Sequence, residues 1–500
     1  MTSLAKPSRS TDQERCIART ERCLPQVYLA VALTLTTLVG RVTAPFFGPD
    51  EPVQSLRAIS LSHGEVLGRM QQGVDEPGAD IDRGARQAME GMDDVRVSWE
   101  RQAGDFHDRN YGPVAGPERE GAVRQLGGIR WEGQTVFTGF GNTIVYPPVF
   151  YLPAMLGWRV GEASGWTIFS SLRLARWLSA LASVALGWWA LRIGIGIRWE
   201  LLAFLLLPSV LFIQASCTQD GAMIASAAVA AAMVSRALEE RRGLQRWELA
   251  VAGILLAGLG MARLPYALLG LVVFVPELEL RRSGWRRWLR PATAFAGVVA
   301  ACWGWRHLVA PLGLDYSDEA DPTAQAAFFR GHPFAAGFAV LRGTGEAGVD
   351  FVRRGLYVVG WNDLLPHHGL EWILVICLLV LVVGMGCKWL SWRGSVVVGL
   401  AVVGSLVGIS AAEYVIWTPV GLGTVYGIQP RYWLPVIPVA MLLFRGLGQT
   451  VSKLRERAVL AAALGTLLVA LTLPAMCAEA FSRAGVWHVV TTVLGSGRAS

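Results

Sequence analysis

Apolar runs close to the length of a membrane-crossing helix recur along this chain from Leu24 to Cys477, and they narrow the folds open to it. A helix needs roughly 17–25 mostly apolar residues to cross a bilayer. The composition agrees, because 53% of the 500 residues are hydrophobic, only 17% are charged and the mean hydropathy is +0.41. These values are untypical of soluble globular proteins. The sequence therefore predicts an all-α polytopic membrane protein.

About eleven runs come near this length. The predicted spans are 24–46, 173–191, 199–216, 221–238, 247–262, 265–280, 290–311, 370–387, 394–412, 432–447 and 458–477. The first is expected to remain as a helix, because the apolar run after Arg22 is too long for a cleaved signal peptide and has no small-residue cleavage pattern.

Basic clusters between the spans predict the orientation, because short loops rich in Lys and Arg stay in the cytoplasm. If the tail 1–23 is cytoplasmic, the other clusters are cytoplasmic too, provided that 146–163 lies at the outer interface and does not cross. In the alternative, 146–163 crosses and every later loop inverts, which places the cluster Arg281 to Arg290 outside. The first model gives two long outer loops, 47–172 and 312–369, transmembrane blocks 173–311 and 370–478, and an outer tail 479–500.

The charge distribution argues against nucleic-acid binding, and the cysteine spacing argues against a metal site or a disulfide framework. The net charge of +7 falls in inter-helix loops and not on one soluble face, so no nucleic-acid partner is expected. The seven cysteines have no metal or disulfide spacing. His63, Asp105, His107 and Asp108 also lack tight ligand spacing, and surface positions are the simpler interpretation.

Asp50 and Glu51 are the strongest candidates for chemistry. They stand between Pro49 and Pro52, directly after the first span and before the amphipathic run Val53 to Leu67. Packing alone explains such a carboxylate pair at the membrane surface poorly. The alternative is that one of them caps the following helix, since an acidic residue in a first turn meets free N–H groups and the helix dipole.

Three more ionisable residues stand at predicted outer span ends: Asp220, Arg263 and Arg431. Charged groups are costly near lipid and tend to face a cavity or a partner. We therefore expect them to face one outer cavity with Asp50 and Glu51. Simpler interpretations remain for each: an N-cap for Asp220, snorkelling to headgroups for Arg263, and an interfacial aromatic belt around Arg431.

The order of these motifs resembles a group of predicted bacterial polytopic membrane proteins carried as a domain of unknown function, which in turn looks like the GT-C superfamily of membrane glycosyltransferases. The resemblance runs from about residue 24 to 448. It rests on Pro49-Asp50-Glu51-Pro52, Phe140-Gly141-Asn142-Thr143, Tyr146-Pro147-Pro148, Tyr151-Leu152-Pro153, Gln219-Asp220-Gly221, Arg263-Leu264-Pro265-Tyr266, Gly360-Trp361-Asn362-Asp363-Leu364-Leu365-Pro366 and Gln429-Pro430-Arg431-Tyr432-Trp433-Leu434-Pro435.

The resemblance implies an enzyme of the bacterial inner membrane that moves a sugar from a polyprenyl-phosphate donor to a glycan or glycolipid acceptor on the extracytoplasmic face, with inversion. Asp50, with Glu51 beside it, matches the superfamily's base or metal-ligand position. The chain departs at Arg263, where a lysine is expected, and at Pro430, where a glycine is expected. The substrate-binding candidates are Asp220, Arg263, Arg431, Tyr146, Tyr266, Gln429 and Tyr432.

Two alternatives stay open. The sequence identifies no particular cofactor, but Asp50, Glu51 and Asp220 leave room for a divalent metal. A transporter or flippase for lipid-linked sugars would also place ionisable groups at span ends, and a polysaccharide polymerase or ligase would share the lipid-phosphate leaving group. No second copy of the Pro-Asp-Glu-Pro or Tyr-Pro-Pro element is visible in the sequence, which disfavours a two-fold repeated transporter.

Overall fold

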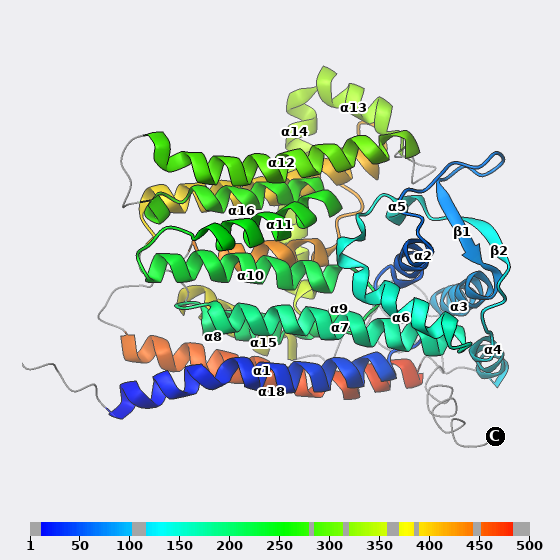
Figure 1. The fold of residues 1–500 in the computed structure, drawn as a ribbon, viewed down its shortest axis with the longest axis horizontal. Coiled ribbons are helices and arrows are strands. Elements are labelled where there is room, and N and C mark those ends of the chain that lie inside the picture. The colour runs from blue at the N-terminus through cyan, green and yellow to red at the C-terminus, as the bar shows by residue number, and fades with distance from the viewer. Residues whose placement is uncertain are drawn as a thin grey trace, which may run out of the picture.

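The protein is a bundle of long helices that run side by side, with shorter elements gathered at one end (Figure 1). The computed structural model describes residues 12–102, 117–279, 285–313, 320–357, 370–384, 390–443 and 452–483. Helix α1 (Asp12–Val42) runs toward the end of the bundle where α2 (Glu51–Ser62) lies across the long helices.

Five helices in the described part of the chain are long and apolar enough to cross a membrane. Their apolar parts are Glu21–Val42 of α1, Ile168–Ile193 (α7), Asp220–Glu239 (α10), Trp392–Ile416 (α16) and Leu460–Ala478 within α18 (Ser452–Arg483). Each coincides with a predicted span, so the membrane character and the helical class are confirmed. The predicted count of eleven is not.

The other predicted spans take three forms. Three are continuous helices that are not among those five: α11 (Arg246–Ala262), α12 (Leu289–Val309) and α15 (Leu370–Gly384). The span predicted at 199–216 is broken into α8 (Arg198–Leu205) and α9 (Pro208–Gln214). Those predicted at 265–280 and 432–447 begin as 3₁₀ helices, η3 (Leu264–Phe274) with η4 (Pro276–Glu279), and η8 (Pro430–Val436) with α17 (Ile437–Ala440).

Proline explains these departures from continuous α-helix. A proline has no N–H group to donate and clashes with the preceding turn, so it starts helices and interrupts them. Pro208 begins α9, Pro276 begins η4, and Pro435 lies inside η8. Such breaks are tolerated at membrane depth where the backbone is covered by protein, and α9 is buried along its whole length.

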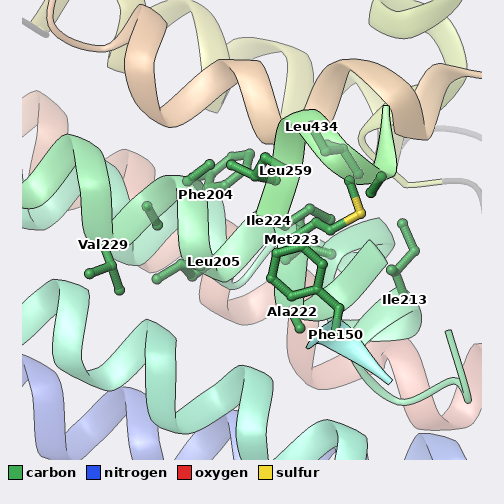
Figure 2. Packing of buried hydrophobic residues seen from close by; sticks show 14 of the residues in the cluster. Phe150, Phe204, Leu205, Ile213, Ala222, Met223, Ile224, Val229, Leu259 and Leu434 are labelled. Atoms are coloured by element: carbon green, nitrogen blue, oxygen red, sulfur yellow. The ribbon is translucent and has the colours of Figure 1, made fainter. Parts of the chain in front are cut away.

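Helix α10 is the centre of the core. In the apolar part of α10, 94% of the residues are buried, against 50% or less in the other four candidate spans. Figure 2 shows side chains of α10, among them Met223 and Ile224, between Phe204 of α8, Leu259 of α11 and Leu434 of η8. A helix that is apolar and buried on all sides occupies the middle of a bundle, and the first residue of this one is Asp220.

The end of the bundle near α2 carries a small insertion. It consists of β1 (Gly78–Asp82), α3 (Arg83–Gln102), α4 (Pro117–Gly127), β2 (Thr135–Gly139), α5 (Gly141–Ile144), η2 (Pro148–Phe150) and α6 (Leu152–Ala163). The two strands pair antiparallel with Asp80 opposite Phe137, which the all-α prediction did not include. The alternating apolar residues Ala79 and Ile81 are buried and hold this two-stranded sheet on the bundle.

Helix α6 covers most of the segment 146–163 and has 12 residues, too few to cross a bilayer. It packs against α2 and α7. The remaining described elements are η5 (Trp285–Trp288), η6 (Ala310–Leu312), α13 (Pro322–Gly331), α14 (Pro333–Asp350) and the π-helical turn η7 (Phe351–Gly355).

Candidate functional site

Asp50 stands at the start of α2 in a left-handed conformation, with φ 53° and ψ 19°. Few non-glycine residues adopt this region, and aspartate tolerates it better than most. Although Asp50 occupies the N-cap position, its side chain makes no capping hydrogen bond. The carboxylate instead forms an ion pair with the guanidinium of Arg431 in η8. The capping alternative therefore does not describe its side chain.

Glu51 has a different environment from its neighbour. Its side chain is fully buried, and Arg176 of α7 donates to both of its oxygens, at 2.7 Å and 2.5 Å. The backbone N–H groups of Cys217 and Gly48 donate to the same carboxylate at 2.7 Å and 3.1 Å. Because these donors fill the carboxylate, Glu51 ties α2 to α7 and to the segment before α10. This geometry is that of a structural ion pair, and the catalytic role that the sequence suggested for Glu51 stays a prediction.

Asp220 joins two arginines. Its Oδ1 lies 3.1 Å from Nη1 of Arg263, and its Oδ2 lies 3.4 Å from Nε of Arg431. The N-cap of α10 is Gln219, which makes no side-chain capping bond. The carboxylate of Asp220 is thus used in ion pairs, and the order Asp50, Arg431, Asp220, Arg263 forms a continuous charged chain.

Aromatic rings enclose the Arg263 end of this chain. The guanidinium carbon of Arg263 lies 4.0 Å from the ring centroid of Tyr432 and 5.9 Å from that of Tyr146, both within cation–π range. The hydroxyl of Tyr266 donates to the backbone carbonyl of Tyr432 at 2.6 Å, which fixes η8 against η3. Arg263 is therefore oriented by packing and not free to extend to headgroups.

Neighbouring charges and burial determine the protonation states of Arg431, Arg263 and Tyr146. Burial alone lowers the pKa of the Arg431 guanidinium, but Asp50 and Asp220 outweigh it and hold this pKa above its usual value. Burial likewise opposes the charge of Arg263, and Asp220 raises its pKa well above the usual value. Burial raises the pKa of Tyr146, so its phenol is neutral and available as a hydrogen-bond donor.

The charged chain borders a cavity of about 650 Å³. Five predicted site residues line it: Asp50, Tyr146, Arg263, Gln429 and Tyr432. The apolar lining includes Val145, Met261, Leu264, Val309, Ile409 and Val415. The cavity therefore combines charged side chains, such as Asp50 and Arg263, with apolar side chains of α11, η3, α12 and α16. This size and pattern are typical of a site for an amphiphilic small molecule.

The remaining predicted residues lie beside the cavity or elsewhere. Asp220, Arg431 and Tyr266 support residues that line it, while Glu51 faces Arg176. His63 pairs with Glu162 at 3.0 Å, away from the site. The motif 360–366 and the residues Asp105, His107 and Asp108 fall outside the described residues. Within the described ranges, no three His, Cys, Asp or Glu side chains are grouped as metal ligands.

Sequence reasoning missed four polar or aromatic residues of the cavity: Trp305, Arg306, Glu413 and Trp417. Trp305 donates to the carbonyl of Val145 at 2.8 Å and joins α12 to the first outer segment. Glu413 lies in the last turn of α16. A lone acidic residue near the end of an otherwise apolar span is a signal that could have identified it.

Residues 33–440 match the family model described as "Predicted membrane protein (DUF2142)". The chain belongs to the DUF2142 family. The matched range of this DUF2142 protein includes every residue of the charged chain and of the cavity lining. Among curated proteins, none matches it significantly.

Proposed function

We propose that this DUF2142 protein is a membrane glycosyltransferase that moves a sugar from a polyprenyl-phosphate donor to a glycan or glycolipid acceptor. The observation that carries the proposal is the cavity, because it combines a carboxylate, two arginines and an apolar wall. Asp50, Arg263 and Arg306 all line it. A donor of this class has the matching parts: a sugar, a phosphate and a long apolar chain.

The chemistry requires a base, a cationic site and an apolar groove. Asp50 removes the proton from the acceptor hydroxyl, and the acceptor oxygen then attacks the anomeric carbon of the donor. The bond from that carbon to the phosphate oxygen breaks, and the lipid phosphate leaves with the electron pair. A single displacement of this kind inverts the configuration at the anomeric carbon.

The two cavity arginines suit the leaving phosphate. Arginine matches phosphate geometry with paired N–H donors. Arg263 is held in place by Asp220 and Tyr432, and Arg306 stands exposed on α12 at the cavity. Preorganised cations of this type lower the energy of the developing phosphate charge.

For Asp50 to act as a base, its pair with Arg431 must loosen when substrate binds. Arg431 has a second carboxylate nearby, since its Nε lies 3.4 Å from Asp220. The proposal therefore includes a shift of Arg431 toward Asp220 and the donor phosphate, which releases Asp50.

The proposal places this site on the extracytoplasmic face of the inner membrane. Arg198, at the start of α8, donates to the carbonyl of Glu21 at 3.2 Å, so a basic loop lies beside the start of the first span. Asp50 follows the other end of that span. With the basic loops in the cytoplasm, the cavity faces outward.

The test compares purified wild type with Asp50→Asn, each given a panel of polyprenyl-phosphate sugars and a membrane-lipid acceptor extract. We expect wild type to release free lipid phosphate and a folded Asp50→Asn protein to do so about 10²–10⁴ times more slowly. Binding without release in both proteins would contradict transfer. Movement of intact donor across proteoliposomes would instead support the transporter or flippase alternative.

A further inference from the structure

Glu413 is the ionisable cavity residue that the proposed reaction does not use. It lies in the last turn of α16 (Trp392–Ile416) and lines the cavity. Its Oε2 atom is buried and accepts no hydrogen bond from any described residue. Leaving a buried carboxylate oxygen without a partner is costly, so such atoms are rare in the absence of a ligand.

Glu277 of η4 also has a buried Oε2 atom without a partner, whereas two other buried carboxylates of the described chain are fully paired. The carboxylate of Glu51 accepts hydrogen bonds from Arg176 and two backbone N–H groups. That of Glu248 accepts them from Arg242 and the N–H of Gln245. Glu413 has charged neighbours in Arg263, Asp50 and Arg431. Glu413 nevertheless forms no ion pair within 4.0 Å with any described residue. The two arginines are paired with Asp220 and Asp50 instead.

The surroundings of Glu413 suit a sugar ring. Trp417 lies one helical turn further on, lines the same cavity and donates its backbone N–H to the carbonyl of Glu413 at 2.9 Å. Sugars present hydroxyl groups at their edge and C–H groups on their face. A carboxylate accepts hydrogen bonds from the hydroxyls, and an indole ring packs against the C–H face.

The loop opposite leaves space for this carboxylate. Gly427 lines the cavity with φ +85°, and a Cβ atom there would lie 2.9 Å from Oε2 of Glu413 and 3.0 Å from the Cβ of Trp417. A side chain at position 427 would therefore press on both residues. The glycine keeps the carboxylate and the indole side by side at the cavity.

We infer that Glu413 and Trp417 form the sugar subsite of the cavity, in which the Glu413 carboxylate accepts hydrogen bonds from hydroxyl groups of the transferred sugar. The inference rests on the proposed function for the class of ligand. It divides the cavity into a sugar subsite at the end of α16, a phosphate subsite at Arg263 and Arg306, and an apolar groove.

The experiment measures binding of two probes to the full-length protein in detergent: a polyprenyl-phosphate hexose, and the same polyprenyl phosphate without sugar. The variants are Glu413→Gln, which keeps size and removes charge, and Trp417→Phe. The matched control is Glu346→Gln, an exposed acid on α14 outside the cavity lining. We expect Glu413→Gln to bind the sugar-bearing probe about tenfold or more weakly and the bare lipid phosphate as wild type does.

The outcomes separate this inference from the proposed function. Equal weakening of both probes, or weakening of neither, would overturn the sugar subsite. Selective weakening in a protein whose wild type binds the sugar probe but never releases lipid phosphate would support the subsite and contradict transfer. Trp417→Phe keeps the test decisive if Glu413→Gln does not fold, because it must show the same selectivity.

Discussion

Asp50 forms an ion pair with Arg431, which lies 381 positions further along the chain. The contact joins the first turn after α1 to η8, and Asp220 at the start of α10 meets the same arginine from the other side. Three segments that are distant in sequence thus share one guanidinium. Its side chain is 3% exposed, so it holds the polar end of the cavity together as a buried junction.

Removing Arg431 is expected to destabilise the protein. Arg431→Gln leaves the carboxylate of Asp220 buried with Arg263 as its remaining partner, and leaves Asp50 without its ion pair. Breaking a buried pair by deleting one member costs about 3–5 kcal/mol in unfolding free energy. Thermal unfolding in detergent measures the loss, and Arg431→Gln combined with Asp50→Asn should recover part of it, because Asp50 is the carboxylate left without a partner. An unchanged melting temperature for the single variant would contradict the junction.

Glu51→Gln tests whether the carboxylate next to Asp50 is structural. Arg176, 3% exposed, would lose its buried counter-charge, so we expect a clear fall in thermal stability, with any loss of activity proportional to the fraction unfolded. Glu162→Gln, which removes a partly exposed carboxylate beside His63, is the control and should change stability little. A stable Glu51→Gln protein that binds donor yet does not react would restore the catalytic interpretation drawn from the sequence.

The long spans were predictable because their signal is strong. Helices such as α7 and α10 carry twenty or more consecutive, mostly apolar residues, and a helix satisfies all its interior backbone hydrogen bonds within itself in lipid. The broken spans were not predictable from hydropathy. Between Arg198 and Gln214 the residues are as apolar as in a span, and the break at Leu206 and Leu207 depends on how Pro208 is packed.

The site was partly predictable for a similar reason. Charged residues at span ends, such as Asp220 and Arg263, are conspicuous in an apolar sequence. Which acid meets which base depends on how helices pack, so nothing in the sequence distinguished Asp50, paired with a cavity-side arginine, from Glu51, paired with Arg176. Glu413 escaped notice because one acid at the end of a strongly apolar span resembles a loop residue.

Arg263→Lys is expected to weaken donor binding without unfolding the protein. Lysine keeps the charge beside Asp220, but it loses the planar guanidinium that lies over Tyr432 and donates to phosphate in pairs. We expect affinity for the bare polyprenyl phosphate to fall about tenfold, as for the loss of one charge-assisted hydrogen bond. Titration of the lipid phosphate against wild type and Arg263→Lys measures it. Equal affinities would remove Arg263 from the phosphate subsite.

Gly427→Ala should impair the site through Glu413. Alanine at φ +85° is strained, and its Cβ would press on the Glu413 carboxylate and on Trp417. Gly421→Ala is the matched control, because its φ of +75° imposes a similar backbone strain while its Cβ would meet the ring of Phe328 at 3.4 Å. We expect similar losses of stability but weaker sugar-probe binding for Gly427→Ala alone. If both variants bind the probe equally, the packing of position 427 does not matter to the cavity.

The side of the membrane is tested by labelling single cysteines in a cysteine-free background. Met70 between α2 and β1 and Trp285 before α12 are both exposed, and they belong to opposite ends of the bundle in the predicted topology. We expect a membrane-impermeant maleimide to label Met70→Cys in intact cells and Trp285→Cys after permeabilisation. The physical reason is the basic cluster around Trp285, including Arg286 and Arg287, which favours the cytoplasm. Labelling of Trp285→Cys in intact cells would show that the predicted orientation of the later helices is inverted. The cavity would then face a donor in the cytoplasm.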